Sequence, residues 1–210
     1  KAKLQRLLEK DRKAVSLSFV RRRKMDKIKE YETVHELYLD IPKDGIGAEI
    51  GVCKGVNAIS LYHLTKPKKF HLCDIWRERH PNACLIEYPC LWEDDHRELV
   101  GRLFKREIEQ GTVELHREYG GNFLYGPEND YLDWIYIDAC NDYKSVSIEI
   151  ENDLHKVKKG GFIMGHDYVT NCQVWKAGVI RAVNEHIQAG KIKMVGISIE
   201  RYPSYVCEVL

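Results

Sequence analysis

Residues 47–61 of this 210-residue chain read GAEIGVCKGVNAISL. The apolar run that ends at Val52 predicts a buried strand, and the pattern from about Val56 onward predicts a helix. Gly51 and Gly55 lie in the turn between them, where the lack of a Cβ lets the backbone come close to a ligand. A strand, a glycine turn and a helix N-terminus are typical of a site for a bound anion or cofactor.

Two acidic residues extend this pattern. Glu49 lies inside the predicted strand, where a buried carboxylate is costly unless it is paired or directed at a ligand. Asp74 ends a second apolar run, residues 70–74, about 20 residues after the glycine turn, where such folds place a carboxylate for ribose hydroxyls. The spacing E-x-G-x-x-x-G is not the dinucleotide motif G-x-G-x-x-G, which argues against an NAD-dependent oxidoreductase.

The rest of the chain alternates between strand and helix patterns. Strands are predicted at about 46–52, 69–74, 112–116, 132–138, 161–165, 192–199 and 204–209. Helices are predicted at about 56–64, 95–109, 143–157 and 174–188. This order predicts a mainly parallel sheet that ends in an antiparallel hairpin. Residues 1–40 are predicted to be a basic, mostly helical N-terminal segment, and residues 41–210 the α/β domain.

Two further stretches complete a set of motifs, LDWIYIDACNDY at 132–143 and KKGGFIMGHDY at 158–168. With them the chain resembles the class I S-adenosylmethionine (SAM)-dependent methyltransferases. Within that superfamily it is similar to the small O-methyltransferases of the macrocin and novobiocin sugar type, from about Gly45 to the C-terminus. The resemblance implies a Rossmann-like seven-stranded sheet of order 3-2-1-4-5-7-6, with strand 7 antiparallel and helices on both faces.

The resemblance also implies S-adenosyl-L-methionine as the cofactor. The methionine part would contact the glycine turn, the ribose would contact the acid that ends the second strand, and the adenine would contact the loop after the third strand. The expected cofactor-binding residues are Glu49, Gly51, Gly55, Asp74, Tyr119, Gly120 and Asp138.

Methyl transfer from a sulfonium is an in-line displacement, so the protein must align the acceptor and remove its proton. In the metal-dependent enzymes that the chain resembles, one acid ends strand four and two adjacent acids end strand five. Here these positions hold Asp138, His166 and Asp167, and Asn141 stands where a histidine base is usual. Two mechanisms stay open. The three residues bind a divalent metal, Mg²⁺ or Mn²⁺, or His166 is the catalytic base and Asp138 or Asp142 orients it.

The identity of the methyl acceptor rests on weaker sequence signals. Four aromatic residues could stack on a sugar ring or fill a core equally well: Trp76, Tyr88, Trp92 and Tyr168. The resemblance favours a hydroxyl of a sugar or glycan as the acceptor. Because the sequence begins with Lys1, we expect a domain of a larger glycan-modifying protein, with a covalently linked glycosyltransferase domain or a homo-oligomer as partner. The alternatives are a methyltransferase for another small molecule, such as a phenol or an amine, and a non-catalytic SAM-fold interaction module.

Composition limits the remaining possibilities. Residues 1–30 hold twelve Lys or Arg against four Asp or Glu, which suits a solvated helix better than a nucleic-acid contact. No apolar run reaches the roughly 20 residues of a membrane helix, so no membrane partner is expected. Seven cysteines without a secretory pattern predict a reducing, cytoplasmic location. A zinc site is a minor alternative, because its candidate ligands match no usual zinc-knuckle spacing: His80, Cys84, Cys90 and His96.

Overall fold

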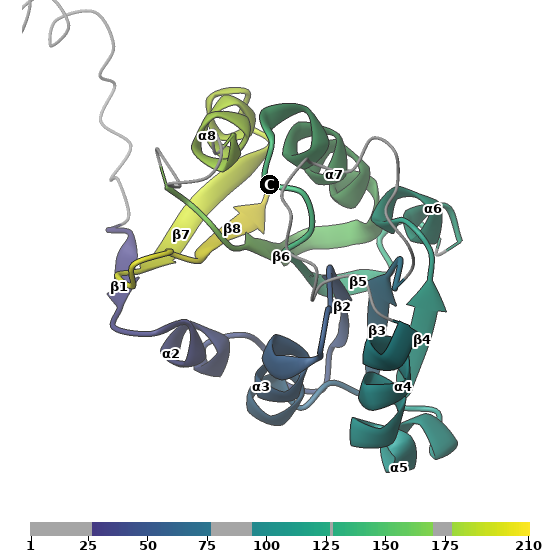
Figure 1. Cartoon of the computed structure of the whole chain (residues 1–210). Helices are drawn as coiled ribbons and strands as arrows, with labels where there is room; N and C mark the ends of the chain where they lie inside the picture. Colours follow the sequence, from purple (N-terminus) through teal and green to yellow (C-terminus); the bar gives the residue numbers. More distant parts are fainter. Residues whose placement is uncertain (1–26, 77–93, 127, 170–177) are drawn as a thin grey trace, which may run out of the picture.

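The computed structural model of the chain describes residues 27–76, 94–126, 128–169 and 178–210. These residues form one sheet of eight strands with helices on both faces (Figure 1). The strand order is β1-β7-β8-β6-β5-β2-β3-β4. All neighbouring strands are parallel except the two pairs that involve β8. The predicted strand order and the antiparallel last strand are confirmed, and β1 adds an eighth strand that the sequence does not predict.

The bounds of the elements lie close to those predicted. The strands are β1 (Lys29–Tyr31), β2 (Ile46–Ile50), β3 (Lys69–Asp74), β4 (Val113–Arg117), β5 (Leu132–Ile137), β6 (Val157–Gly165), β7 (Ile192–Ser198) and β8 (Tyr205–Val209). The helices are α2 (Val34–Leu39), α3 (Val56–Thr65), α4 (Asp94–Leu103), α5 (Lys105–Glu109), α6 (Gly120–Tyr125), α7 (Tyr143–Lys156) and α8 (Val179–Gln188). In the described part of the chain, every helix is too short or too polar to cross a membrane.

The first described strand lies inside the N-terminal segment that is predicted to be mostly helical. Residues 29–31 form β1, which pairs in parallel with β7 at the edge of the sheet. Tyr31 is buried, and its hydroxyl donates to Asp40 Oδ2 at 2.8 Å, while Lys29 forms an ion pair with the same carboxylate. Helix α2 then packs beside α3, so the fold begins before the predicted boundary at residue 41. Residues 1–26 lie outside the described part of the chain.

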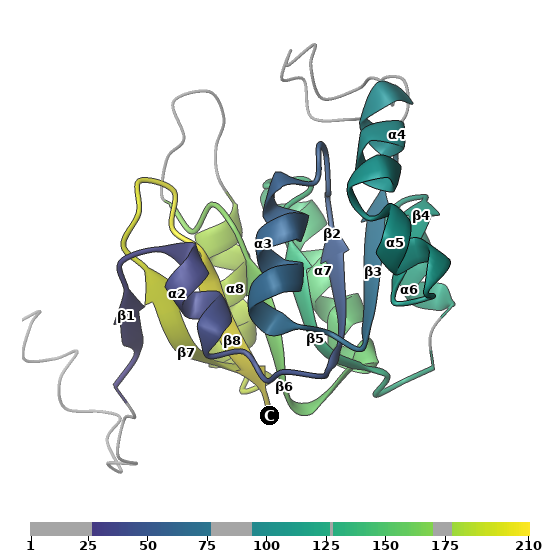
Figure 2. The ribbon, with the colours of Figure 1, turned by 90° about the horizontal axis from the view of Figure 1, so that it is seen from below.

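The sheet separates two apolar cores. One face is covered by α6, α7 and α8, with Val146 and Ile150 of α7 among its buried side chains. The other face is covered by α2, α3 and α4, which contribute Leu37, Leu61 and Val100 (Figure 2). Because both faces are covered, the central parallel strands are apolar on both sides, and polar side chains gather where these strands end.

A buried carboxyl group on α7 makes the stability of the fold depend on pH. Glu149 Oε2 is buried without a hydrogen-bond partner among the described residues. Burial, and then the charge of Asp142, raises the pKa of Glu149 from 4.5 to about 8. The folded chain therefore keeps a proton that the unfolded chain releases, and stability falls as the pH rises from about 4.5 to about 8.

The variant Glu149→Gln removes this titration. We expect it to exceed the wild type in unfolding free energy by on the order of 2–4 kcal/mol above pH 8, and to match it near pH 4. Urea unfolding at pH 4, 6 and 8.5 measures the difference. Glu109→Gln, on the exposed surface of α5, is the matched control and should follow the wild type at each pH. Equal stability of Glu149→Gln and the wild type at pH 8.5 would contradict the raised pKa.

Candidate active site

The turn between β2 and α3 has the conformation that its two glycines predict. Gly51 has a φ of 91° and Gly55 a φ of 79°, both in the left-handed region. A Cβ on Gly51 would lie 2.1 Å from the backbone oxygen of Asp138, so glycine is what lets the ends of β2 and β5 meet. Gly55 caps α3 without a side-chain hydrogen bond. The N–H groups of the first turn of α3 are therefore open to a ligand.

Glu49 is held by a short chain of hydrogen bonds. Its side chain is buried, and Oε1 accepts from Asn57 Nδ2 at 2.9 Å, while Asn57 Oδ1 accepts from the Tyr38 hydroxyl at 2.7 Å. Oε2 is buried with no partner among the described residues. Burial raises the pKa of Glu49 well above its ordinary value, and Asp138 and Asp74 add to this. The carboxyl group is thus fixed at the carboxyl end of β2, with one oxygen left for a polar partner.

Asp74 joins the glycine turn to the end of β3. Its Oδ2 accepts from the backbone N–H of Cys53 at 2.8 Å, and its Oδ1 accepts from the backbone N–H of Trp76 at 2.9 Å. Each carboxylate oxygen has two lone pairs, so both keep capacity for ribose hydroxyls. The predicted position of Asp74 beside the turn is confirmed.

The four aromatic residues that could stack on a sugar ring or fill a core lie in different environments. Trp76 is buried in the core, and its Nε1 donates to the Cys53 backbone oxygen at 2.9 Å, so stacking of Trp76 on an acceptor is wrong. Tyr168 is half-buried beside α8, and its hydroxyl donates to Asn184 at 3.0 Å. Tyr88 and Trp92 lie outside the described residues.

The loop after β4 lies against the end of β2. Gly120 begins α6 so close to β2 that a Cβ there would lie 2.5 Å from Ile50 Cγ2. Tyr119 is the N-cap residue of α6, and its side chain is exposed. The structure therefore places both residues predicted for the adenine side close to the end of β2.

Three titratable side chains meet beyond the carboxyl ends of β5 and β6. His166 Nδ1 lies 3.7 Å from Asp138 Oδ1 and 3.4 Å from Asp167 Oδ1. One ligand atom from each residue lies within 4.8 Å of the others. Burial raises the pKa of Asp138 to about 6, with His166 opposing and Asp167 adding to the shift. Burial also raises the pKa of Asp167, which His166 opposes.

Two polar residues that follow β5 have different roles: one contacts this cluster and the other caps α7. Asn141 Nδ2 donates to Asp167 Oδ2 at 2.6 Å and so orients that carboxylate. Asp142 instead caps α7, where it accepts from the backbone N–H groups of Lys144 and Ser145 and from the Ser145 hydroxyl. The carboxylates that the structure describes beside His166 are Asp138 and Asp167, so Asp142 does not orient His166.

Sequence reasoning missed two residues that the structure adds to the site, and it gave no role to a third, Asn141. Asn57 and Tyr38 hold Glu49, and Asn141 holds Asp167. Asn57 and Asn141 could have been found, because each follows a predicted site residue within a turn. Tyr38 could not, because only the packing of α2 beside α3 brings it there.

Comparison with known proteins identifies the family and the fold. A family model described as a methyltransferase domain matches residues 48–168. A protein from Streptococcus mutans, described as a methyltransferase in complex with SAH, has a similar structure, with a TM-score of 0.57 at 12% identity over 84% of this chain and 96% of that chain. The N-methyltransferase NodS from Bradyrhizobium japonicum has a TM-score of 0.56 at 14% identity over 84% and 94% of the two chains.

The tRNA methyltransferase TrmK from B. subtilis is also similar, with a TM-score of 0.56 at 12% identity over 88% of this chain and 68% of that chain. No curated protein sequence matches the chain. At such identities the solved structures show a shared fold and not a shared substrate. The family match, in contrast, covers more than half of the chain and runs from β2 through the His166–Asp167 pair. The chain therefore belongs to the methyltransferase-domain family and has the class I methyltransferase fold.

Proposed function

We propose that this chain uses S-adenosyl-L-methionine to methylate a hydroxyl group of a sugar or glycan. The observation that carries the proposal is the position of His166 between Asp138 and Asp167, at the same edge of the sheet as the glycine turn. A hydroxyl group is a poor acid and needs a base or a metal ion before it can attack a methyl group. An amine is already a nucleophile when neutral, so a cluster of this kind favours an oxygen acceptor.

The described residues fit SAM. The glycine turn and the first turn of α3 offer backbone N–H groups, and Asp74 offers a carboxylate for the ribose. The buried Oε2 of Glu49, which has no partner among the described residues, suggests that a polar group of a ligand belongs at the end of β2. Solved proteins of this fold are described with SAH or with natively bound SAM, which supports the same cofactor here.

In the first of two mechanisms, His166 is the catalytic base. Its Nδ1 faces both carboxylates, which leaves Nε2 to accept the proton of the acceptor hydroxyl. Asp138 and Asp167 would then stabilise the charged ring that forms. Asn141 would keep Asp167 in place through its hydrogen bond.

In the second mechanism, Asp138, His166 and Asp167 hold a divalent ion. Their ligand atoms are close enough together, and a set of two carboxylates and one imidazole suits Mn²⁺ better than Mg²⁺. Burial, with Asp167 adding to it, raises the pKa of Asp138 to about 6, and the charge of a bound cation would oppose both effects. A bound ion would supply positive charge to an acceptor oxygen.

Calorimetric titration of SAH into the protein, before and after EDTA treatment, tests the proposal. Micromolar binding, roughly −8 kcal/mol, would support the cofactor assignment. Turnover with deoxysugar acceptors, measured on the same two samples, separates the mechanisms, because only the metal mechanism predicts loss of activity with EDTA. Absence of SAH binding would favour a non-catalytic interaction module. Turnover confined to phenols or amines would contradict a sugar acceptor.

A further inference from the structure

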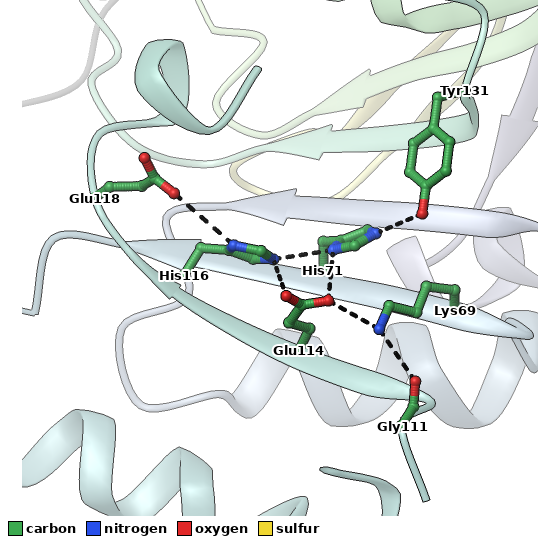
Figure 3. A network of polar contacts seen from close by, with 7 residues as sticks. All are labelled: Lys69, His71, Gly111, Glu114, His116, Glu118 and Tyr131. Carbon is green, nitrogen blue, oxygen red and sulfur yellow. Dashed lines mark hydrogen bonds and ion pairs between the residues drawn. The ribbon is translucent and has the colours of Figure 1, made fainter. Parts of the chain in front are cut away.

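A second group of titratable side chains lies on β3 and β4 (Figure 3), and none of its members belongs to the candidate active site. His71 of β3 is in register with Glu114 of β4, and His116 follows on the same strand. Alternate residues of a strand share a face, so all three side chains project to the same side of the sheet. That side is covered by α6, whose Phe123 ring lies 5.4 Å from the His71 ring and 4.6 Å from the His116 ring, centroid to centroid.

The donor atoms of these three residues nearly form a metal-binding triangle. His71 Nδ1 lies 2.9 Å from His116 Nε2. Glu114 Oε2 lies 3.9 Å from His71 Nδ1, and Glu114 Oε1 lies 4.0 Å from His116 Nε2. Tetrahedral zinc with bonds near 2.0–2.1 Å needs donor atoms about 3.3 Å apart. Shifts of about 0.4–0.7 Å, within the reach of side-chain rotation, would bring all three to that spacing.

We propose that His71, Glu114 and His116 bind one transition-metal ion of the zinc type. Two imidazoles and one carboxylate suit Zn²⁺, Co²⁺ or Ni²⁺ better than the oxygen-seeking Mg²⁺ and Ca²⁺. The two imidazoles form the buried side of the site, because the side chain of His71 is only 7% exposed and that of His116 only 18% exposed. Glu114 is 50% exposed and leaves the outer side open, where water is the fourth ligand.

The outer nitrogen of each ring already has a polar partner. His71 Nε2 lies 3.1 Å from the Tyr131 hydroxyl, and His116 Nδ1 lies 3.8 Å from Glu118 Oε1. A carboxylate or hydroxyl behind a histidine is the usual second partner of a metal ligand, and it turns the other nitrogen toward the ion. Burial, and then the nearby His116, lowers the pKa of His71 to about 4, and burial lowers that of His116. Both rings are therefore neutral, the form that binds metal.

Lys69 is the residue that opposes the ion. Its Nζ lies 2.8 Å from Glu114 Oε2 and 3.1 Å from the backbone oxygen of Gly111. The ammonium group therefore holds the carboxylate by the same oxygen that lies nearest His71. An incoming cation must share Glu114 with Lys69 or displace it, so the affinity of the site depends on this lysine.

A bound ion would link two strands that lead into the candidate active site. His71 lies just before Asp74 on β3, and His116 lies just before the loop of Tyr119 and Gly120. The ion would tie the end of edge strand β4 to β3, where the ribose and adenine contacts of the proposed cofactor begin. The inference itself does not depend on methyl transfer, because metal binding is measured without a methyl acceptor.

The test is titration of Zn²⁺, and of Co²⁺ as a spectroscopic probe, into the protein after chelator treatment. His116→Gln and Glu114→Gln remove one ligand each. His155→Gln, an exposed histidine on α7, is the matched control. His166→Gln reports on binding at the candidate active site, and the visible spectrum of bound Co²⁺ separates thiolate ligands from nitrogen and oxygen ligands.

We expect His116→Gln to lose one ion equivalent, with at least a 100-fold fall in affinity, and Glu114→Gln to weaken the same equivalent at least tenfold. Glu118→Gln should weaken it by about 10–100-fold through the orientation of His116. Lys69→Met should strengthen binding of this ion. His155→Gln and His166→Gln should bind the ion with wild-type affinity. Wild-type affinity and stoichiometry in both His116→Gln and Glu114→Gln would overturn the proposal, and so would an ion that is lost only in His166→Gln.

Discussion

Replacing His166 with alanine is expected to lower methyl transfer by about 10²–10⁴-fold, the usual contribution of a general base. The affinity for SAH should change little, because its contacts are assigned to the glycine turn and Asp74 and not to the end of β6. The measurements are initial rates at saturating acceptor and calorimetric titration with SAH. His63→Ala, an exposed histidine on α3, controls for the loss of a ring at the surface.

Two further measurements distinguish a role of His166 as catalytic base from a role as metal ligand. If His166 is the base, added imidazole should restore part of the activity of His166→Ala, and EDTA should not affect the wild type. If His166 is a ligand, Asp167→Asn should lower turnover as strongly, and EDTA should abolish the activity of the wild type. Collapse of SAH affinity in His166→Ala, or turnover at the wild-type rate, would show that His166 has neither role.

The central part of this site could be predicted from sequence because its signals are local. Gly51 and Gly55 mark a turn that a Cβ would block or strain, and Asp74 ends an apolar run. The parallel register then brings these strand ends together without further information. Asp142 was instead predicted to orient His166, although its place before a helical pattern also suits a helix cap; its side chain accepts from N–H groups two and three residues later.

Other features depend on contacts that sequence spacing does not reveal. The three residues of β1 carry no strand signal of their own, and their pairing with β7 is tertiary. Trp76 looks like a surface aromatic in a loop, but a φ of 34° and its bond to the Cys53 oxygen turn it into the core. His71 and His116 are far apart along the chain, and only the register of β3 with β4 makes them neighbours.

Replacing Gly51 with alanine should affect both the fold and the cofactor site. The new Cβ would lie 2.1 Å from the backbone oxygen of Asp138, at a φ of 91° that alanine avoids. Two hydrogen bonds hold the neighbouring strand ends together, from Gly51 N–H to Cys73 O at 2.9 Å and from Asp138 N–H to Ile50 O at 2.8 Å. The strand ends must therefore separate. We expect a loss of about 2–5 kcal/mol in unfolding free energy, from the left-handed conformation and the overpacking together.

The variant Gly111→Ala separates the cost of the left-handed conformation from the cost of overpacking. Gly111 has a φ of 74°, but a Cβ there would meet nothing within 4 Å. This variant should lose only about 1–2 kcal/mol, the cost of the left-handed conformation, and should bind SAH like the wild type. Gly51→Ala should lose more than that and should bind SAH at least 100-fold more weakly, because the turn that offers its N–H groups has moved. Urea unfolding and SAH calorimetry on both variants measure the difference. Wild-type SAH affinity in a folded Gly51→Ala protein would mean that this turn packs β2 against β5 without contacting the cofactor.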